Sequence, residues 1–374
     1  MALARRARRA EQELIVSRCR ARRSVSTLVA VLLSAGVATA QLQWESKDGK
    51  TSFRFGLLSQ VMAESVDLPG TDDDADNIFL RRFRLIGQLK LDEELTVFIQ
   101  TDSPNLGKGA PSGTKDTGDV FLQDVVATWN PAQQFHLDGG LLLTEQTYNH
   151  NQSAASLLAV DYGAFTFDES TPTGSRVGRD LGLRVRGYLF DDLLEYRAGI
   201  YQGDRGTNAN NDFRYMGRLM VHLLGPQTGL TYRGSSLGKS KGLSIGGSYD
   251  TQEDYDSYGA DVFFEHPFGD GNGVVAQFDY VWLDGGSFLP TLVERNNLLF
   301  EGGVYLGAPK LQPFVQIASR DLEGPGGEEH RYGFGVGWYP GGQGNNLKLA
   351  FTHIDGAGGS KSDQINLQWQ VFTF

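Results

Sequence analysis

Alternation between apolar and polar side chains recurs in sixteen segments of this chain, each about ten residues long. A period of two residues is typical of a β-strand with one apolar face, and Gly, Pro, Asn or Asp separates most neighbouring segments. No segment of comparable length has the 3.6-residue period of an amphipathic helix, so the pattern predicts an all-β protein. The predicted strands are 51–61, 78–91, 94–101, 120–129, 135–143, 181–190, 194–202, 213–223, 242–250, 256–266, 273–283, 297–307, 312–320, 330–339, 346–354 and 363–373.

The strand predicted at 78–91 fits two kinds of protein. Its apolar face comprises Phe79, Phe83, Leu85, Leu89 and Leu91. Its polar face comprises Arg82, Arg84, Gln88 and Lys90. In a soluble sheet the apolar face would turn to a core, whereas in a membrane barrel it would face lipid and the cations would line the lumen. Because an Arg at the lipid midplane costs about 2–4 kcal/mol, the cations of a barrel must face inward.

The connections between predicted strands differ in length from one side of the sheet to the other. The turns expected on the periplasmic side are short, apart from 224–241: they are 92–93, 130–134, 191–193, 308–310 and 340–344. The connections expected on the outer side include the long segments 62–77, 102–119 and 144–180. This segregation, with an even strand number, is typical of bacterial outer-membrane barrels. We therefore predict a 16-stranded antiparallel transmembrane β-barrel in the outer membrane. The alternative fold, that of a soluble β-rich binding protein, would not explain why short connections lie on one side of the sheet and long connections on the other.

The first forty residues have the pattern of a secretory signal. Eight arginines lie in 5–23, an apolar run follows at 25–37, and Ala38-Thr39-Ala40 matches an A-x-A cleavage site. We predict a signal peptide at 1–40 and a barrel at 41–374, with a short anchor helix as the alternative for 1–40. The first forty residues hold eight basic and two acidic residues, so the remainder has 26 basic and 43 acidic residues. Nucleic acid is an unexpected partner for such a chain, and the loss of Cys19 leaves no thiol chemistry.

Sorting strand residues by parity places an excess of cations on the lumen side in the first half of the chain. The predicted pore-lining and anion-binding residues are Arg54, Arg82, Arg84, Lys90, Arg184, Arg186, Arg197, Arg214 and Arg218. The second half contributes one cation, Lys348, and the carboxylates Asp261, Glu265, Asp279 and Glu301. Guanidinium groups match phosphate and carboxylate geometry, so the basic wall predicts a preference for small anions. The alternative is that the cations pair with acids to fill the lumen, for example Arg184 and Arg186 with Glu195.

Three stretches resemble the phosphate-selective porin O/P family. They are LRRFRLIGQLKLDEELTVFIQTDSP at 80–104, QDVVATWNPAQQFHLDGG at 123–140 and RDLGLRVRGYLFDDLLEYRAGIYQGD at 179–204. The resemblance covers about residues 78–205 and implies a trimeric, often anion-selective channel surrounded by lipid and lipopolysaccharide. The ending INLQWQVFTF is similar to that of outer-membrane barrels, provided that a bulge brings Phe374 to the face of Trp369. Passive diffusion through such a channel needs no cofactor.

The connection 144–180 is the third on the predicted outer side, and in porins the third outer loop folds inward and narrows the channel. Loops of this length are uncommon unless they are functional. The apolar patches at 154–160 and 165–167 predict that this loop packs against the barrel wall. Arg176 and Arg179, near its end, are the predicted constriction-loop cations, with structural anchoring as the alternative.

Motifs for metal binding, nucleotide binding or catalysis are weak in this chain. Asp72, Asp74 and Asp76 have the spacing of a calcium loop, but the Gly and Glu that such a loop requires are missing. The run 238–240, Gly-Lys-Ser, lacks the first glycine of a phosphate-binding loop, and the six histidines have no metal-ligand spacing. We therefore predict no metal, no cofactor and no enzymatic activity. The alternative is an outer-membrane barrel enzyme, such as a lipase with a Ser–His pair.

Overall fold

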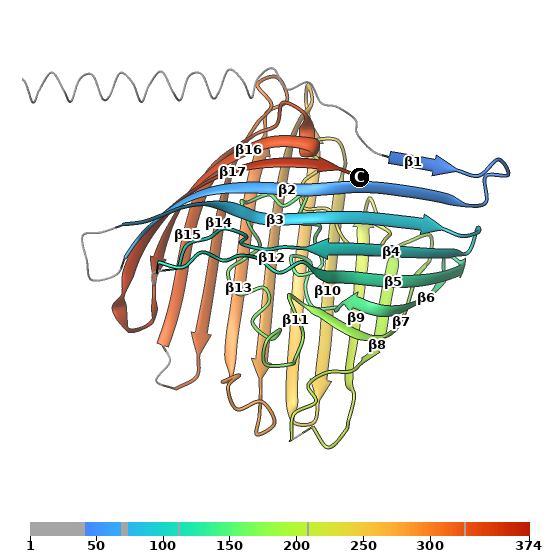
Figure 1. Ribbon diagram of the computed structural model, residues 1–374, viewed down its shortest axis with the longest axis horizontal. Helices are drawn as coiled ribbons and strands as arrows, with labels where there is room; N and C mark the ends of the chain where they lie inside the picture. The colour runs from blue at the N-terminus through green and yellow to red at the C-terminus, as the bar shows by residue number, and fades with distance from the viewer. Residues whose placement is uncertain (1–41, 69–73, 111–112, 208, 325–326) are drawn as a thin grey trace, which may run out of the picture. The chain divides into compact units, whose positions relative to one another are not determined.

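The computed structural model describes residues 42–374 apart from 69–73, 111–112, 208 and 325–326, so the predicted signal peptide at 1–40 lies outside the described residues. Strands β2 to β17 pair antiparallel in chain order, and β17 pairs with β2, so that sixteen strands form a closed ring (Figure 1). The strands of the first half are β2 (Ser52–Asp67), β3 (Asp74–Lys90), β4 (Leu95–Asp102), β5 (Phe121–Ala132), β6 (Phe135–Leu143), β7 (Arg179–Leu189), β8 (Leu194–Tyr201) and β9 (Arg214–Leu224). Those of the second half are β10 (Gly242–Gln252), β11 (Tyr255–Phe268), β12 (Asn272–Asp284), β13 (Arg295–Tyr305), β14 (Leu311–Leu322), β15 (Gly327–Trp338), β16 (Asn345–Asp355) and β17 (Lys361–Thr373).

The ring confirms the predicted 16-stranded antiparallel barrel, because each predicted strand overlaps one of β2 to β17. The segment predicted as an outer loop at 62–77 is different: β2 continues to Asp67 and β3 begins at Asp74, so most of this segment is strand. A short additional strand, β1 (Leu42–Glu45), was not predicted. It pairs with Ser52–Phe55 of β2, directly beyond Leu57, where the ladder between β17 and β2 ends.

The outward face of the barrel is apolar and the inward face is polar. On β7, for example, Leu181 and Leu183 point outward and are 53% and 56% exposed. The next residue, Arg184, points inward and is only 2% exposed. This confirms the sidedness that the lipid-face cost of arginine predicts. Among the described residues, no helix is long and apolar enough to cross a membrane. The helical elements of this part of the chain are two 3-10 turns, Gly342–Gly344 and Ala357–Gly359.

A bulge in β3 changes the predicted facing of its first residues. Gln60 of β2 pairs with Arg82, and the next residue, Val61, pairs with Leu80, so Arg81 is the extra residue of the bulge. A residue added to one strand reverses the parity of everything beyond it. Phe79, predicted to face lipid, is therefore buried on the inside of the barrel.

The C-terminal residue also faces inward. The ladder between β17 and β2 runs without a register shift from Gln364 to Thr373, so the bulge that was expected to turn Phe374 outward is absent from this ladder. The ring of Phe374 instead makes an edge contact with Phe98, with 6.2 Å between the ring centroids. The guanidinium of Arg54 lies 5.0 Å from the centre of the same ring.

Candidate pore and its constriction

The connection 144–178, between β6 and β7, folds into the barrel, and side chains of the wall bind its main chain. Gln60 of β2 donates to the carbonyl of Ala154 at 3.1 Å, and the ammonium of Lys348 on β16 donates to two carbonyls, those of Leu157 and Ala159, at 2.6 and 2.8 Å. Equivalent bonds are made by Gln370 to Ala155, Gln368 to Val160 and Gln316 to Asp161. Carbonyl groups removed from water need such donors. The wall therefore fixes the path of this loop through its backbone.

The apolar side chains of the same loop pack on the wall, as predicted. Leu157 and Leu158 are buried, and Phe165 packs with Leu299 of β13 and Ala318 of β14. The predicted inward-folding third loop is thus present, and it covers the wall formed by the second half of the chain.

A second connection, 225–241 between β9 and β10, folds into the barrel from the opposite end. Its Tyr232 forms a parallel β-bridge with Gln152 of the first loop. The amide of Ser153 donates to the Tyr232 carbonyl at 2.9 Å, and the amide of Tyr232 donates to the Asn151 carbonyl at 2.8 Å. The sequence analysis identified this connection only as an unusually long turn. The two inward segments stabilise one another because each supplies backbone partners for the other.

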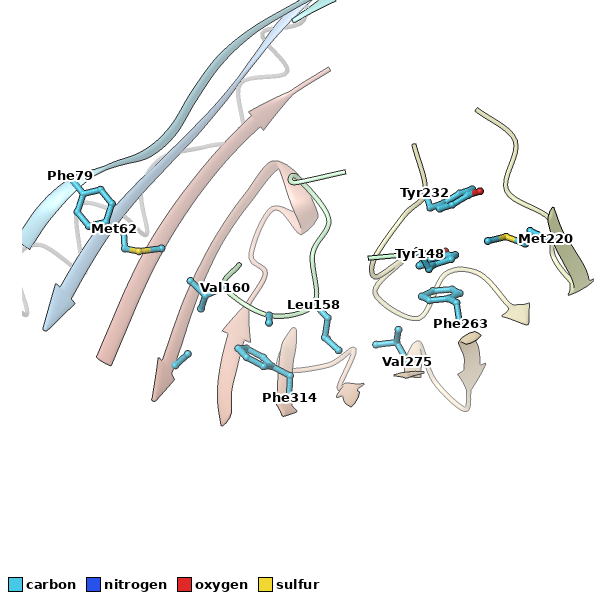
Figure 2. Packing of buried hydrophobic residues seen from close by; sticks show 12 residues of the cluster. Met62, Phe79, Tyr148, Leu158, Val160, Met220, Tyr232, Phe263, Val275 and Phe314 are labelled. Carbon is cyan, nitrogen blue, oxygen red and sulfur yellow. The ribbon is translucent and has the colours of Figure 1, made fainter. Parts of the chain in front are cut away.

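Stacked aromatic rings close the space where these two segments meet. Tyr148 of the first loop lies between Tyr232 of the second segment and Phe263 of β11, with ring centroids 4.8 and 4.2 Å apart (Figure 2). The guanidinium groups of Arg197 and Arg218 lie over Tyr232, at 4.8 and 5.8 Å from its centre. This part of the lumen, along β8 to β12, is called the sealed half below.

Two cavities lie beside the inward loop, in the part of the lumen that is called the cavity side below. Strands β2, β3 and β14 to β17 line the outer cavity, and strands β3 to β7 with the end of the chain line the inner one. The outer cavity, about 370 Å³, reaches Asn105 and Lys108 in the connection between β4 and β5. The inner cavity, about 250 Å³, reaches Gln88 near the opposite end of β3. Tyr162 lines both cavities, and its hydroxyl donates to the carbonyl of Gln152 at 2.7 Å. Because Tyr162 is the residue that the linings of the two cavities share, it is the candidate constriction between them.

A cluster of two arginines and one aspartate borders the constriction on its outer side. The bulge in β3 turns both Arg81 and Arg82 toward Asp161 of the loop; Arg81 binds one carboxylate oxygen at 2.6 Å and Arg82 binds the other. Partial burial raises the pKa of Asp161, but the two guanidinium groups outweigh this effect and hold its pKa below the usual range. The guanidinium of Arg82 also lies 5.3 Å from the centre of the Tyr162 ring.

The inner cavity has its own arginines, each with a carboxylate nearby. Arg84 binds Asp102 at 2.9 Å, and Arg179 binds Asp124 at 3.2 Å. Arg184 binds both Asp138, at 2.7 Å, and Glu145 of the inward loop, at 2.6 Å. The cations thus face the cavity while carboxylates balance part of their charge.

The structure places seven of the nine predicted pore-lining cations deep inside the barrel, and each of these seven has a carboxylate partner. Arg82, Arg84 and Arg184 line the cavities. The other four pairs are Arg186–Asp138, Arg197–Glu195, Arg214–Asp250 and Arg218–Asp261. The prediction that Arg184 and Arg186 pair with Glu195 is wrong, because Glu195 binds Arg197 and His222.

The remaining predicted cations lie at different depths. Arg54 lies over Phe374 near the inner cavity, and Lys90 is half-buried at the end of β3. Of the two predicted constriction-loop residues, Arg179 is the first residue of β7 and lines the inner cavity. Arg176 is exposed, its guanidinium lies 3.4 Å from the centre of the Phe121 ring, and it lines neither cavity.

Several residues around the constriction were not identified from the sequence. Arg81 has the parity of a lipid-facing residue unless the bulge is known, and Lys108 lies in a loop, where it binds Glu64 at 2.7 Å. Asp161 and Tyr162 follow directly after the apolar patch 154–160 that was predicted to pack on the wall. The position of Asp161 and Tyr162 at the end of this patch is the sequence signal that could have pointed to these two residues.

The motifs that were considered for other chemistry have structural roles. His222 contacts Ser244 at 2.8 Å and Glu195 at 3.1 Å, but this buried Ser–His–Glu group does not line either cavity. The amides of Lys239 and Ser240 donate to the Ser236 hydroxyl at 3.1 and 3.0 Å. Asp74 and Asp76 belong to β3, and Asp72 lies outside the described residues. Within the described part of the chain, no three His, Cys, Asp or Glu side chains are grouped to hold a metal ion.

Comparison with solved structures shows the fold. The outer-membrane channel DcaP of Acinetobacter baumannii has a TM-score of 0.56 and 13% identity, covering 88% of this chain and 99% of DcaP. OprB of Pseudomonas putida has a TM-score of 0.57 and 12% identity, covering 87% of this chain and 94% of OprB. OmpT of Vibrio cholerae, an outer-membrane protein in trimer form, has a TM-score of 0.52 and 11% identity, covering 86% and 99%. No protein-family model and no curated protein matches the sequence. The chain therefore has the barrel fold of bacterial outer-membrane proteins, and its resemblance to the porin O/P family stays a prediction.

Proposed function

We propose that this protein is a passive diffusion channel of the bacterial outer membrane that prefers small anions, phosphate among them. The observation that carries the proposal is the pair of cavities that meet at Tyr162. In the outer cavity four cations, Arg81, Arg82, Lys108 and Arg331, oppose two carboxylates, Glu64 and Asp161. In the inner cavity three cations, Arg84, Arg179 and Arg184, oppose one carboxylate, Asp124. An excess of fixed positive charge along a water-filled path favours anions.

The preference is expected to be moderate. Asp102, Asp138 and Glu145 lie behind the arginines of the inner cavity and balance part of their charge. Such pairing occupies N–H groups of these arginines, as at Arg184, whose three guanidinium nitrogens all donate to protein acceptors, and it lowers the net potential that an ion meets. Discrimination by net charge alone should therefore be weak.

The rest of the proposal concerns assembly and catalysis. A homotrimer surrounded by lipid and lipopolysaccharide agrees with the family resemblance and with the trimeric form of OmpT. We also infer that the protein is not an enzyme. The Ser–His–Glu group of Ser244, His222 and Glu195 favours the alternative, an outer-membrane barrel enzyme, but all three side chains are buried behind Tyr232 and lie outside both cavities.

The zero-current potential across a planar bilayer under a KCl gradient tests the proposal, with the purified protein measured before and after phosphate is added. We expect an anion-selective potential and a decrease of the chloride current when phosphate occupies the path. A cation-selective potential would contradict the anion preference and leave the channel intact. Absence of conductance from correctly folded protein would favour the enzyme alternative.

A further inference from the structure

Apolar side chains border the outer cavity, although the lumen of a water-filled barrel is normally polar. Met62 of β2, Phe79 of β3 and Phe314 of β14 all line this cavity, together with Val160 of the inward loop. Figure 2 shows Met62 and Phe79 next to each other on one side, and Val160 and Phe314 on the other. The bulge at Arg81 is what turns Phe79 inward, so the same irregularity brings an aromatic ring and two guanidinium groups to one cavity.

The inner cavity repeats this combination with different residues. Ile86, Phe98, Val126 and Phe374 line it beside the guanidinium groups of Arg84 and Arg184. Phe98 comes from β4 and Phe374 from the end of the chain, so this apolar lining is built independently of the bulge in β3. Both cavities on the path past Tyr162 therefore combine guanidinium donors with aromatic and aliphatic surface.

We infer that the solutes that this channel favours are organic anions with an apolar body, an inference that rests on the proposed function. The oxyanion group accepts hydrogen bonds from a guanidinium that lines the cavity, such as that of Arg81, whose side chain is 25% exposed, and the hydrocarbon part contacts Phe79 or Phe98. Inorganic phosphate makes the first contact only, and a neutral aromatic solute makes the second only. The outer cavity has the size of an ordinary small-molecule site, about 300–1,000 Å³. An apolar contact is favourable because it removes hydrocarbon surface from water.

Permeability ratios in planar bilayers test this inference. Benzoate is the probe, with chloride and phosphate as reference anions and benzyl alcohol as a neutral competitor. The zero-current potential with sodium benzoate on one side and sodium chloride on the other gives the benzoate-to-chloride ratio. We expect benzoate to be more permeant than phosphate, and to block chloride current at concentrations at which benzyl alcohol does not.

Substitutions in the two cavities separate the apolar contact from charge. Phe79→Gln and Phe98→Gln should each lower the benzoate-to-chloride ratio about twofold to tenfold, the range that one aromatic contact supports. Phe79→Leu, which keeps an apolar side chain, is the matched control and should retain most of the ratio. Two positions are used so that a folding defect at one, seen as loss of heat-modifiable gel mobility, leaves the other informative.

The outcomes distinguish this inference from the proposed function. An unchanged ratio in both Gln variants, or a wild-type channel that passes phosphate as readily as benzoate, would overturn the inference while the anion preference in KCl stands. A cation-selective potential in KCl would overturn the proposed function, and the inference with it.

Discussion

The cavity side and the sealed half of the lumen use arginine differently. In the sealed half, Arg218 makes two bonds to Asp261, at 2.7 and 2.8 Å, and lies beneath Tyr232, so its charge is paired and covered. On the cavity side, Arg81 and its partner Asp161 line the outer cavity, and their side chains are 25% and 31% exposed. The number of inward-facing arginines therefore does not measure how strongly the lumen attracts anions. Pairing and cover decide which of them a solute can reach.

The largest effect expected from this difference is on stability. Arg218→Leu leaves Asp261 buried without its bidentate partner, which should destabilise the barrel by about 3–5 kcal/mol. Arg82→Leu is the matched control and should cost less, because Asp161 keeps Arg81 and contact with water. Urea unfolding, followed by folded gel mobility, gives both values. Equal losses for the two variants would mean that cover by the inward segments does not matter.

The next effect concerns the loop that separates the two sides. Lys348→Met removes the donor to the carbonyls of Leu157 and Ala159, and a hydrogen bond from a charged group contributes about 1.5–3 kcal/mol. We expect a higher and noisier single-channel conductance, because the loop loses part of its anchoring. Lys310→Met, which removes a bond to the Pro340 carbonyl in an exposed turn, should leave the conductance unchanged. An unchanged conductance and noise level in Lys348→Met would show that the hydrogen bonds from the wall glutamines are enough to hold the loop in place.

Selectivity should change in opposite directions at the two partners of one ion pair. Asp161→Asn removes a carboxylate at the outer cavity and should raise the anion-to-cation permeability ratio about fivefold, from a charge interaction of about 1 kcal/mol in water. Arg82→Gln should lower the ratio by a similar factor. The zero-current potential in a KCl gradient measures both changes. Shifts of the same sign would point to a change of loop position instead of a direct charge effect.

The smallest effect is expected at Arg176, the predicted constriction residue that lines neither cavity. Arg176→Gln removes a contact with the Phe121 ring that is worth about 0.5–1 kcal/mol at an exposed site. The zero-current potential should stay at the wild-type value, in contrast to Arg179→Gln, which alters the inner cavity. A shift in Arg176→Gln as large as that in Arg179→Gln would place both residues on the ion path.

The strands were predictable because their signal is local and repeated. Alternation in the ring of β2 to β17 is set by lipid on one face and polar contacts on the other, and this holds for each strand independently. The bulge at Arg81 was not predictable, because the sequence 78–91 alternates acceptably in either register. Because of this one extra residue, the prediction assigned Phe79 to the lipid face and left Arg81 out of the lumen.

The contents of the lumen were only partly predictable. The apolar patch 154–160 correctly indicated a loop packed on the wall, since apolar residues in a long loop need a surface to cover them. The partners of the arginines depend on which strands are neighbours and on where the two inward segments lie. Glu145 and Asp161 belong to a loop whose path is fixed by donors from β2, β14, β16 and β17, far away in the sequence. Such contacts leave no periodic signal.

The pairing of β17 with β2 has a consequence for assembly of the barrel. This seam joins residues that are far apart in the sequence; Leu57 and Thr373, for example, are 316 positions apart. Contacts between residues so distant in sequence form late in folding, because the conformational entropy of the intervening chain must be given up before the contacts can stabilise the barrel. Until then β2 has an open edge, which is a template for pairing with other chains. Strand β1, its neighbour in sequence, covers only Ser52–Phe55 of that edge. Newly exported chains therefore depend on shielding of the rest of β2 until the last strand arrives.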